Sequence, residues 1–327
     1  MFRRSWLLFL LLVLAGCVTA PVTAAAAEQT KRIALSFDDV PRQPGAFLTP
    51  DERTSALIEA LERAGVEQAA FFVTTGNLER PHGVGGEARI AFYVAAGHVI
   101  ANHSHSHRWL HRTPAEEYVA DLDRASAWLE GRPGYRPWFR FPFLDEGRRD
   151  QAKRDFVRSA LRARGLANGY VTVDTYDWHL DSLLTSAVRE GKAIDRDALG
   201  RLYAQSLVEA ANFANALALE TLGRSPAHML LLHETDLAAL FIDEAVKALR
   251  ADGWEIVTAD EAYADPIAAI EPDTHFLGNG RIAAIAAAAG RPPAELTSPW
   301  TEEEFISRLF NALVLQQGGA SETRQEP

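Results

Sequence analysis

The sequence of 327 residues predicts an α/β barrel, in which helices surround a parallel sheet. Two features of the chain support this prediction. Short apolar runs alternate with helical patterns between residues 31 and 262, and strands that alternate with helices form parallel sheets. Most of these runs also end in polar side chains, and in such barrels the carboxyl ends of the strands carry the chemistry. A chain of this length is often a single barrel.

Seven apolar runs predict the strands of the sheet. They are residues 31–40, 68–75, a short run from residue 98 that leads into the histidines of 103–107, 138–143, 170–178, 228–234 and 254–262. Apolar residues at helical spacing lie between them, with start and stop signals such as Thr49-Pro50-Asp51 at the first helix and Gly131 after the third. The predicted helices span 49–66, 88–97, 113–131, 150–164, 196–222 and 237–251.

Composition argues against several classes of protein. The chain is 47% hydrophobic, enough for a large core, and its 44 acidic and 33 basic residues give a net charge of −11. Because no basic run follows the first few residues, nucleic acid is not a predicted partner. Cys17 is the single cysteine. If processing consumes it, the folded domain has no disulfide, no cysteine nucleophile and no cysteine ligand for zinc.

The N-terminus predicts export. Arg3 and Arg4 precede a short apolar stretch, which is the pattern of a secretory signal and is too short to span a membrane comfortably. The stretch ends in Leu14-Ala15-Gly16-Cys17, which resembles a bacterial lipobox. We therefore predict a protein of the bacterial cell envelope, facing the periplasm and anchored to the membrane by a lipid on Cys17. The alternative is an ordinary signal peptide cleaved in the alanine run 24–27.

Three regions follow from this pattern. Residues 1–27 contain the signal, with cleavage before Cys17, and the start of a tether. Residues 28–265 form the predicted barrel, and residues 266–327 form an alanine-rich C-terminal appendage with helical spacing over 301–316. The polar composition of its last ten residues predicts disorder at the end of the chain.

Five of the predicted strand ends carry polar side chains suited to catalysis. They are Asp38 and Asp39, His103 and His107, Arg140, Asp174 and Asp177, and His233. Each group alone has a structural explanation, because paired aspartates often cap turns and single histidines or arginines are often structural. Gathered at one edge of a sheet, they predict a reaction site. Two histidines and one carboxylate suit Zn²⁺ or a similar ion and leave open positions for water and substrate.

Residues 102–107 read NHSHSH, and their conformation decides how many histidines can share a site. On a strand, His103, His105 and His107 would all point the same way. On a helical turn, His103 and His107 would share a face and His105 would point away. Both conformations are open at the level of the residues alone.

The polar groups belong to five motifs whose order resembles the polysaccharide deacetylases of carbohydrate esterase family 4, which share the NodB-homology, or chitooligosaccharide deacetylase, domain. The resemblance covers about residues 31–265. The matching segments are Ser36-Phe37-Asp38-Asp39, His103-Ser104-His105-Ser106-His107, Arg140-Phe141-Pro142-Phe143, Asp174-Thr175-Tyr176-Asp177-Trp178 and Leu231-Leu232-His233. No single motif is decisive, but the ordered set is specific. It implies a distorted, seven-stranded barrel that hydrolyses an N-acetyl, or alternatively an O-acetyl, group on a polysaccharide or oligosaccharide.

The resemblance also implies which residues bind a metal and activate water. Asp39, His103 and His107 would hold a divalent metal, with Zn²⁺ favoured and Co²⁺ or a similar ion as alternatives. Asp38 would act as the base that takes a proton from metal-bound water. Arg140 would hold Asp38 in place and keep it ionised. By the same assignment His105 would lie outside the ligand set, as in the turn conformation.

The remaining implied roles concern the leaving group and the acetyl pocket. His233 would be the acid that protonates the leaving nitrogen. Asp177 would orient His233 and favour its imidazolium form. Phe143, Trp178 and Leu231 would line the pocket for the acetyl group.

The chain departs from the family pattern at several positions. Val40-Pro41 stand where a glycine usually follows the two acids, Phe141 and Phe143 replace a frequent Pro and Tyr, and Glu234 stands where Asp is common. None of these changes removes a catalytic group. Together with the long helical insertion between Trp178 and residue 228, they affect the expected substrate more than the expected reaction.

Two other functions fit parts of the sequence. The histidine run superficially resembles the H-x-H-x-D-H motif of binuclear metallohydrolases, but His107 stands at the Asp position and Arg108 follows it. A catalytically silent glycan-binding lipoprotein would share the barrel, although a full set of acid, base and ligands argues against it. An acetylated glycan is the predicted partner. The sequence leaves the identity of that glycan and the oligomeric state open.

Overall fold

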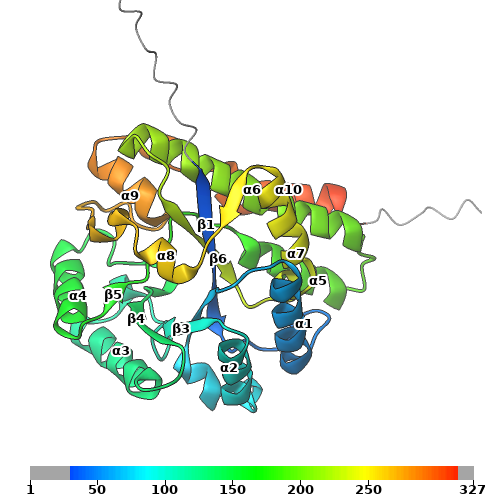
Figure 1. Ribbon diagram of the computed structural model, residues 1–327, viewed down its shortest axis with the longest axis horizontal. Coiled ribbons are helices and arrows are strands. Elements are labelled where there is room, and N and C mark those ends of the chain that lie inside the picture. The colour runs from blue at the N-terminus through cyan, green and yellow to red at the C-terminus, as the bar shows by residue number, and fades with distance from the viewer. Residues whose placement is uncertain (1–29, 316–327) are drawn as a thin grey trace, which may run out of the picture.

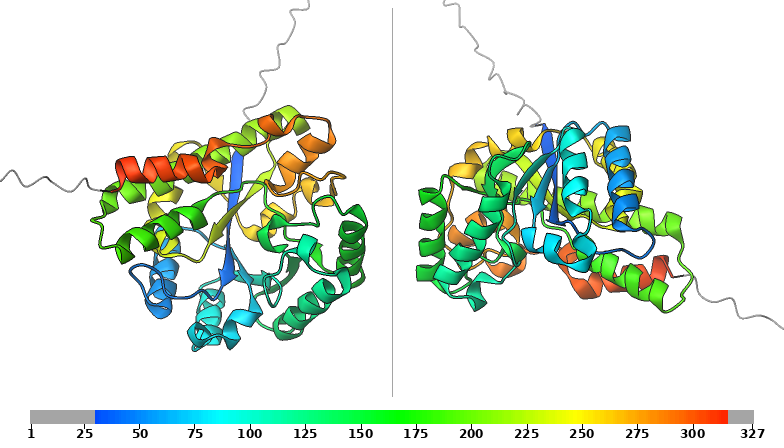
Figure 2. Two further views of the ribbon diagram at one scale, coloured as in Figure 1. Left: turned by 180° about the vertical axis from the view of Figure 1, so that it is seen from behind. Right: turned by 90° about the horizontal axis from the view of Figure 1, so that it is seen from below.

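The computed structural model describes residues 30–315, which form a curved parallel sheet surrounded by helices (Figures 1 and 2). The strands are β1 (Lys31–Val40), β2 (Ala70–Val73), β3 (Val99–Asn102), β4 (Tyr135–Phe139), β5 (Ala167–Asn168), β6 (Ala227–His233) and β7 (Trp254–Ile256). The helices are α1 (Pro50–Arg63), α2 (Gly86–Ala95), α3 (Ala115–Leu129), α4 (Gln151–Ala163), α5 (Asp177–Arg189), α6 (Arg196–Leu222), α7 (Asp236–Ala251), α8 (Ala259–Tyr263), α9 (Gly280–Ala288) and α10 (Glu303–Leu313).

Several predictions made for the two ends of the chain fall outside the described residues. The signal, the lipobox with Cys17 and the polar C-terminal stretch are among them, so these stay predictions. Among residues 30–315, no helix is both long and apolar enough to cross a membrane.

The seven strands form one parallel sheet in the order β5-β4-β3-β2-β1-β6, and β7 pairs with the start of β1. Residues 167–175 close the gap between β5 and β6. At one end the Gly169 N–H donates to the Phe139 carbonyl of β4 at 2.7 Å, and at the other the Leu231 N–H of β6 donates to the Val173 carbonyl at 3.0 Å. The distorted, seven-stranded barrel implied by the resemblance is therefore confirmed.

Most of the predicted strands are shorter in the structure, and two of them, 170–178 and 254–262, change character. Residues 170–178 make only one isolated bridge, from Val173 to Leu230. Gly169, just before them, still bonds to β4, whereas the N–H groups of Thr172 and Val173 already donate to β6, so the chain crosses between the two strands here. Asp177 already begins α5, which lies in the insertion predicted as helical after Trp178 but was given no bounds of its own. In the predicted strand 254–262 only the first three residues pair, because Thr258 and Glu261 form a capping box that starts α8.

Alternation along β1 separates the core from the site. Leu35 and Phe37 face the outer core under the helices, whereas Ala34 lies in the inner core of the barrel. Because side chains alternate along a strand, Asp38 faces the inside of the barrel, as Ala34 does. On β6, His233 faces the inside in the same way as Leu231. The register pairs Asp38 with His233. The two side chains are therefore cross-strand neighbours at the carboxyl mouth of the barrel.

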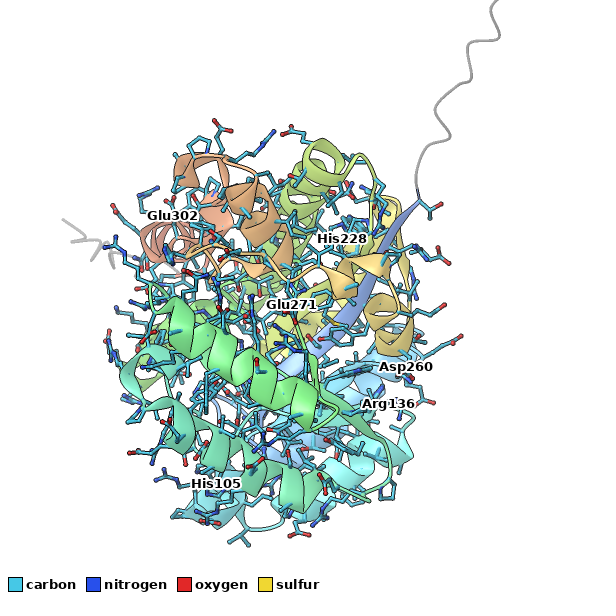
Figure 3. The ribbon with its side chains drawn as sticks, turned by 90° about the vertical axis from the view of Figure 1, so that its left-hand side faces the viewer. His105, Arg136, His228, Asp260, Glu271 and Glu302 are labelled. Carbon is cyan, nitrogen blue, oxygen red and sulfur yellow. The ribbon has the colours of Figure 1, made fainter. Side chains whose placement is uncertain are left out.

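Helix α8 fills the barrel toward the amino ends of the strands. Ala259 and Ala262 pack in the inner core. Arg136, near the start of β4, donates from Nε and Nη2 to the two carboxylate oxygens of Asp260, each at 2.8 Å, and Figure 3 shows this pair side by side. This end of the barrel is therefore closed by packing, and the pocket opens at the other end.

The C-terminal helices pack against the barrel. Ile306 and Phe310 of α10 belong to the same outer core as β1, and α9 contributes to a smaller core with α6. Figure 2 shows α10 beside α5 and α6. Whether residues 266–327 form a separate unit stays a prediction.

Candidate active site

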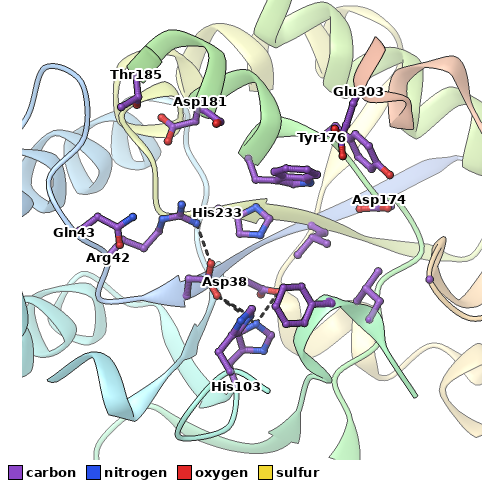
Figure 4. A pocket seen from close by; sticks show the side chains of 18 of the residues that line it. Asp38, Arg42, Gln43, His103, Asp174, Tyr176, Asp181, Thr185, His233 and Glu303 are labelled. Carbon is purple, nitrogen blue, oxygen red and sulfur yellow. Dashed lines mark hydrogen bonds and ion pairs between the residues drawn. The ribbon is translucent and has the colours of Figure 1, made fainter. Parts of the chain in front are cut away.

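The carboxyl ends of the strands surround a pocket of about 750 Å³ (Figure 4). Eight of the ten predicted site residues line it: Asp38, Asp39, His103, His107, Phe143, Trp178, Leu231 and His233. The other two, Arg140 and Asp177, are buried behind the pocket wall. Residues from five separate parts of the chain thus meet in one cavity.

Asp39 reaches the pocket through an irregular backbone. Strict alternation after Asp38 would turn the next side chain toward the outer face. The pairing of β1 with β2 shifts register between Phe37 and Val40, and Asp39 has a φ of 69°, in the left-handed region. Such a bulge re-aims a side chain, and left-handed φ is uncommon for a residue other than glycine. The bulge allows two successive aspartates to face the same pocket.

The NHSHSH stretch is neither a strand nor a helical turn. β3 ends at Asn102, and the chain then bends, with φ of 66° at Ser104 and 53° at His107. The His107 N–H donates to Ser104 Oγ at 2.9 Å and fixes the bend. His103 and His107 meet with ring centroids 4.9 Å apart, whereas His105 is buried elsewhere and pairs through Nδ1 with Thr75 Oγ1 at 2.9 Å. As in the turn alternative, His105 points away.

Asp39, His103 and His107 form a cluster whose potential ligand atoms lie within 4.8 Å of one another. Asp39 Oδ1 is 3.0 Å from His107 Nε2 and 3.6 Å from His103 Nε2. In a tetrahedral zinc site with bonds of about 2.0–2.1 Å, ligand atoms are roughly 3.4 Å apart. The donor types and these spacings therefore fit a divalent ion such as Zn²⁺.

The tautomer of His103 also suits a ligand. Its Nδ1 lies 3.0 Å from the Arg140 carbonyl, which can only accept, so Nδ1 carries the proton and Nε2 has the free lone pair. Burial lowers the pKa of His103 to about 4, which keeps the ring neutral at neutral pH. Burial would raise the pKa of Asp39, but His107 and Arg42 hold it well below its usual value. The cluster thus offers one neutral imidazole and one carboxylate.

Asp38 is held by a buried arginine. Arg140 donates from Nη1 to Asp38 Oδ1 at 2.6 Å and to Ser36 Oγ at 2.8 Å. Its Nε donates to the Gly169 carbonyl at 2.7 Å, its Nη2 donates to the Tyr263 hydroxyl at 2.8 Å, and the guanidinium lies 3.7 Å over a phenylalanine ring of β2. Because all three nitrogens of the guanidinium group are hydrogen-bonded, the group cannot rotate away from Asp38.

His233 is held by Asp177, which begins α5. The His233 Nδ1 lies 2.8 Å from Asp177 Oδ1, and the His233 backbone N–H donates to Oδ2 at 2.7 Å. Burial opposes the charged ring, but the Asp177 carboxylate outweighs it and raises the pKa of His233 to about 9. At neutral pH the ring is therefore an imidazolium, and its Nε2 takes no part in the contact with Asp177.

Three features of the site were not predicted from the sequence. Arg42 Nη1 donates to Asp39 Oδ2 at 2.9 Å, so only Oδ1 faces the histidines. Tyr263, far from every motif, completes the support of Arg140. Asp174 was noted at a strand end without a role, and it lines the pocket with a pKa raised by burial to about 7. Of these three residues, only Arg42 could have been found from the sequence. It is a cation three residues after Asp39, next to Val40-Pro41, where the chain departs from the family motif.

Aromatic rings flank the pocket mouth. Phe143, 43% exposed, stacks on Trp109 with ring centroids 3.8 Å apart and an interplanar angle of 2°. Trp178, on α5, is 36% exposed and lies near Tyr176. All four rings line the pocket, which suits the apolar face of a sugar ring.

Solved structures with a similar chain path include several described as deacetylases or related proteins. The chitin deacetylase from Colletotrichum lindemuthianum is 18% identical over 73% of this chain and 89% of that chain, with a TM-score of 0.49. The family 4 carbohydrate esterase from Streptomyces lividans is 19% identical over 72% and 96%, with a TM-score of 0.45. A family 4 pseudoenzyme from Bacillus anthracis is 16% identical over 71% and 65%, with a TM-score of 0.45.

A family-level comparison gives the assignment. No curated protein matches the chain. The family model described as polysaccharide deacetylase matches residues 25–160, a range that includes the aspartate pair, the histidine run and the Arg140 motif. The resemblance that the motifs indicate is confirmed by this match: over residues 25–160 the chain is similar to the polysaccharide deacetylases, a family of hydrolases.

Proposed function

We propose that the protein removes acetyl groups from an N-acetylated, or alternatively O-acetylated, polysaccharide or oligosaccharide. The observation that carries this proposal is the register of β1 with β6, which sets a carboxylate, Asp38, directly opposite an imidazolium, His233. Both stand beside the cluster of Asp39, His103 and His107 in the same pocket. A base, an acid and a metal-ligand set within one cavity match the needs of amide hydrolysis.

Asp39, His103 and His107 would hold the divalent ion that this family implies, with zinc as our proposal. Bound there, such an ion would polarise the acetyl carbonyl and make the attacking water more acidic. Three protein ligands leave further positions open for water and substrate. Arg42 supports this role because it binds Asp39 Oδ2 and leaves Oδ1 toward the histidines.

Asp38 would take the proton from the attacking water. Arg140 occupies Oδ1, so the proton would go to Oδ2, which lies 3.5 Å from His103 Nε2 and thus on the cluster side. Arg140 also supplies the counter-charge that a buried carboxylate needs. The base is therefore fixed in place before substrate arrives.

His233 would protonate the leaving group. An amine is a poor leaving group unless its nitrogen gains a proton in the transition state. The Asp177 contact keeps Nδ1 engaged, so Nε2–H is the proton that can be donated. Leu231, Trp178 and Phe143 would surround the acetyl methyl group and the sugar face.

Acetate release from acetylated chitooligosaccharides, peptidoglycan and acetylated xylan tests this proposal. We expect release from at least one of them, loss of activity on chelation, and recovery with Zn²⁺ or Co²⁺. Binding of a glycan by metal-loaded protein without acetate release would instead support a silent glycan-binding protein. Hydrolysis of phosphate esters or lactams in place of acetyl groups would support a different metallohydrolase. The lipobox supports placing the activity in the cell envelope, which also remains a proposal.

A further inference from the structure

The loop between β1 and α1 carries Arg42 to the pocket, and its backbone is held by three buried, charged side chains. They are Arg53 on α1, Glu234 directly after β6 and Asp236 at the start of α7, and none is more than 1% exposed. None of them lines the pocket or has a role in the proposed reaction. A buried charge is costly unless it is paired and hydrogen-bonded, so the partners of these side chains indicate what they do.

The backbone of Arg42 is held at both of its polar groups. Glu234 Oε2 accepts a hydrogen bond from the Arg42 N–H at 2.8 Å, and Arg53 Nη2 donates to the Arg42 carbonyl at 3.0 Å. Arg53 Nη1 donates to the Gln43 carbonyl at 2.9 Å. The second carboxylate oxygen of Glu234, Oε1, accepts from the Tyr93 hydroxyl at 2.7 Å, which keeps the first one directed at the loop.

These charged groups bind the loop more closely than they bind one another. The ion pairs are long, with 3.7 Å from Arg53 Nη2 to Glu234 Oε2 and 3.6 Å from Arg53 Nη1 to Asp236 Oδ1. Asp236 Oδ2 accepts from the backbone N–H groups of Phe47 and Leu48 at 2.7 and 3.1 Å. The shortest contacts of the three side chains thus go to other groups, mainly to the loop backbone, and they hold the loop in one conformation.

This conformation sets the position of the Arg42 guanidinium group. Figure 4 shows the Arg42 side chain at the pocket, which it lines. Its Nη1 donates to Asp39 Oδ2 at 2.9 Å, while Asp39 Oδ1 lies 3.0 Å from His107 Nε2. One oxygen of Asp39 is therefore bound by Arg42, and the other faces the histidines.

We propose that Glu234 and Arg53 are positioning residues for the metal centre and act on it through Arg42. They fix the backbone of Arg42, Arg42 holds Asp39 Oδ2, and Asp39 offers a single oxygen to the ion. A ligand that is already held in place loses less freedom when the ion binds, and binding through one oxygen leaves positions open for water and substrate. The inference rests on the proposed function only in taking the Asp39 cluster as the metal site.

Zinc affinity tests this series of contacts, measured by competition between the zinc-loaded protein and a chromophoric chelator. Arg42→Met and Glu234→Met should each weaken zinc binding about 10–100-fold, the usual effect of removing a partner of a metal ligand. Glu234→Gln keeps a carbonyl oxygen for the Arg42 N–H and should stay within a few-fold of the wild type. Unchanged affinity in Arg42→Met or in Glu234→Met would overturn the proposal.

A double variant shows whether Glu234 acts through Arg42. Glu234→Met should have no further effect on zinc affinity in an Arg42→Met background, and additive losses would overturn this route. If Glu234→Met does not fold, Arg53→Lys takes its place in the same comparison. Lysine keeps the charge but lacks the guanidinium group that bonds the Arg42 and Gln43 carbonyls together.

Asp265→Asn is the matched control for a purely structural effect. Asp265 is also a buried carboxylate that accepts from two backbone N–H groups, those of Ala227 and Ile267, each at 2.9 Å, and it does not line the pocket. The control should lower the free energy of unfolding in urea and leave zinc affinity unchanged. Equal losses of zinc affinity in Asp265→Asn and Glu234→Met would mean that affinity merely follows stability, and would overturn the proposal.

Acetate release separates this inference from the proposed reaction. Acetate release by the wild type, together with the same zinc affinity in every variant, would refute the positioning role and leave the reaction standing. Zinc affinities in the expected order, without acetate release from any acetylated glycan, would support the positioning role and refute the reaction. A wild-type protein that does not bind zinc would overturn the metal centre and this inference together.

Discussion

Replacing Asp177 by Asn should remove the acid function of His233 at neutral pH. In the wild type the contact from His233 Nδ1 to Asp177 Oδ1 is 2.8 Å, and the pKa of His233 rises from 6.5 to about 9 despite burial. At roughly 1.4 kcal/mol per pH unit, this rise corresponds to about 3 kcal/mol in favour of the imidazolium. Without that carboxylate, burial and Arg42 lower the pKa of His233 and only Asp39 raises it, so the pKa should fall to 6.5 or lower.

The effect should appear in two independent measurements. The alkaline limb of kcat/KM should lie near pH 9 in the wild type and move below pH 7 in Asp177→Asn. The raised pKa also stabilises the fold, fully below pH 6.5, and this contribution is lost as pH rises through about 9. Urea unfolding should therefore show a decline of about 3 kcal/mol between pH 6 and pH 10 that the variant lacks.

The structure offers a matched control in a second carboxylate–imidazole pair. His111 Nδ1 lies 2.8 Å from Asp145 Oδ2, and neither residue lines the pocket. Asp145→Asn should leave the alkaline limb near pH 9. If Asp177→Asn also leaves the limb there, or if NMR titration shows a pKa for His233 near 9 in that variant, the assignment of His233 as an acid tuned by Asp177 is wrong.

Three further predictions concern the support of the base, the ligand set and the anchor. Arg140→Met should lower the free energy of unfolding by about 3–5 kcal/mol, because it leaves a buried carboxylate unpaired. Arg136→Met removes a partly exposed ion pair and should lower it by about 1 kcal/mol or less. Equal losses for the two variants in urea titrations would contradict this prediction. Metal analysis should find His105→Ala loaded and His107→Ala empty, and the reverse would mean that the ligand set is wrong. Full-length protein should fractionate with membranes and Cys17→Ser should not; wild-type protein that is soluble in the periplasm and cleaved in the alanine run would refute the lipobox.

Much of the barrel could be predicted from the sequence because its strands are apolar and its helices amphipathic. The segment 170–178 could not, since its apolar residues fit a strand and only the fold shows that the chain crosses from β4 to β6 there. The start of helix α5 was missed for the same reason. It begins at Asp177, inside a run that looked extended.

The polar groups of the site could be predicted because they fall at strand ends in a recognisable order. Their geometry could not be predicted in full. Alternation along β1 would have separated Asp38 from Asp39, and it is the bulge with left-handed φ at Asp39 that brings both to the pocket. Support from Tyr263 was beyond sequence reasoning, because it reaches Arg140 from helix α8, outside all five motifs.

Acetate release and metal content of Asp38→Asn, measured on the same preparation, test whether this pocket hydrolyses acetyl groups by the proposed route. Asp38 Oδ1 binds Arg140, and Asp38 is not part of the ligand cluster. The variant should therefore keep its metal while acetate release falls about 10²–10⁴-fold, the usual effect of losing a general base. His105→Ala, prepared in parallel, should keep both metal and most of its activity. Acetate release near the wild-type rate in metal-loaded Asp38→Asn would contradict the mechanism.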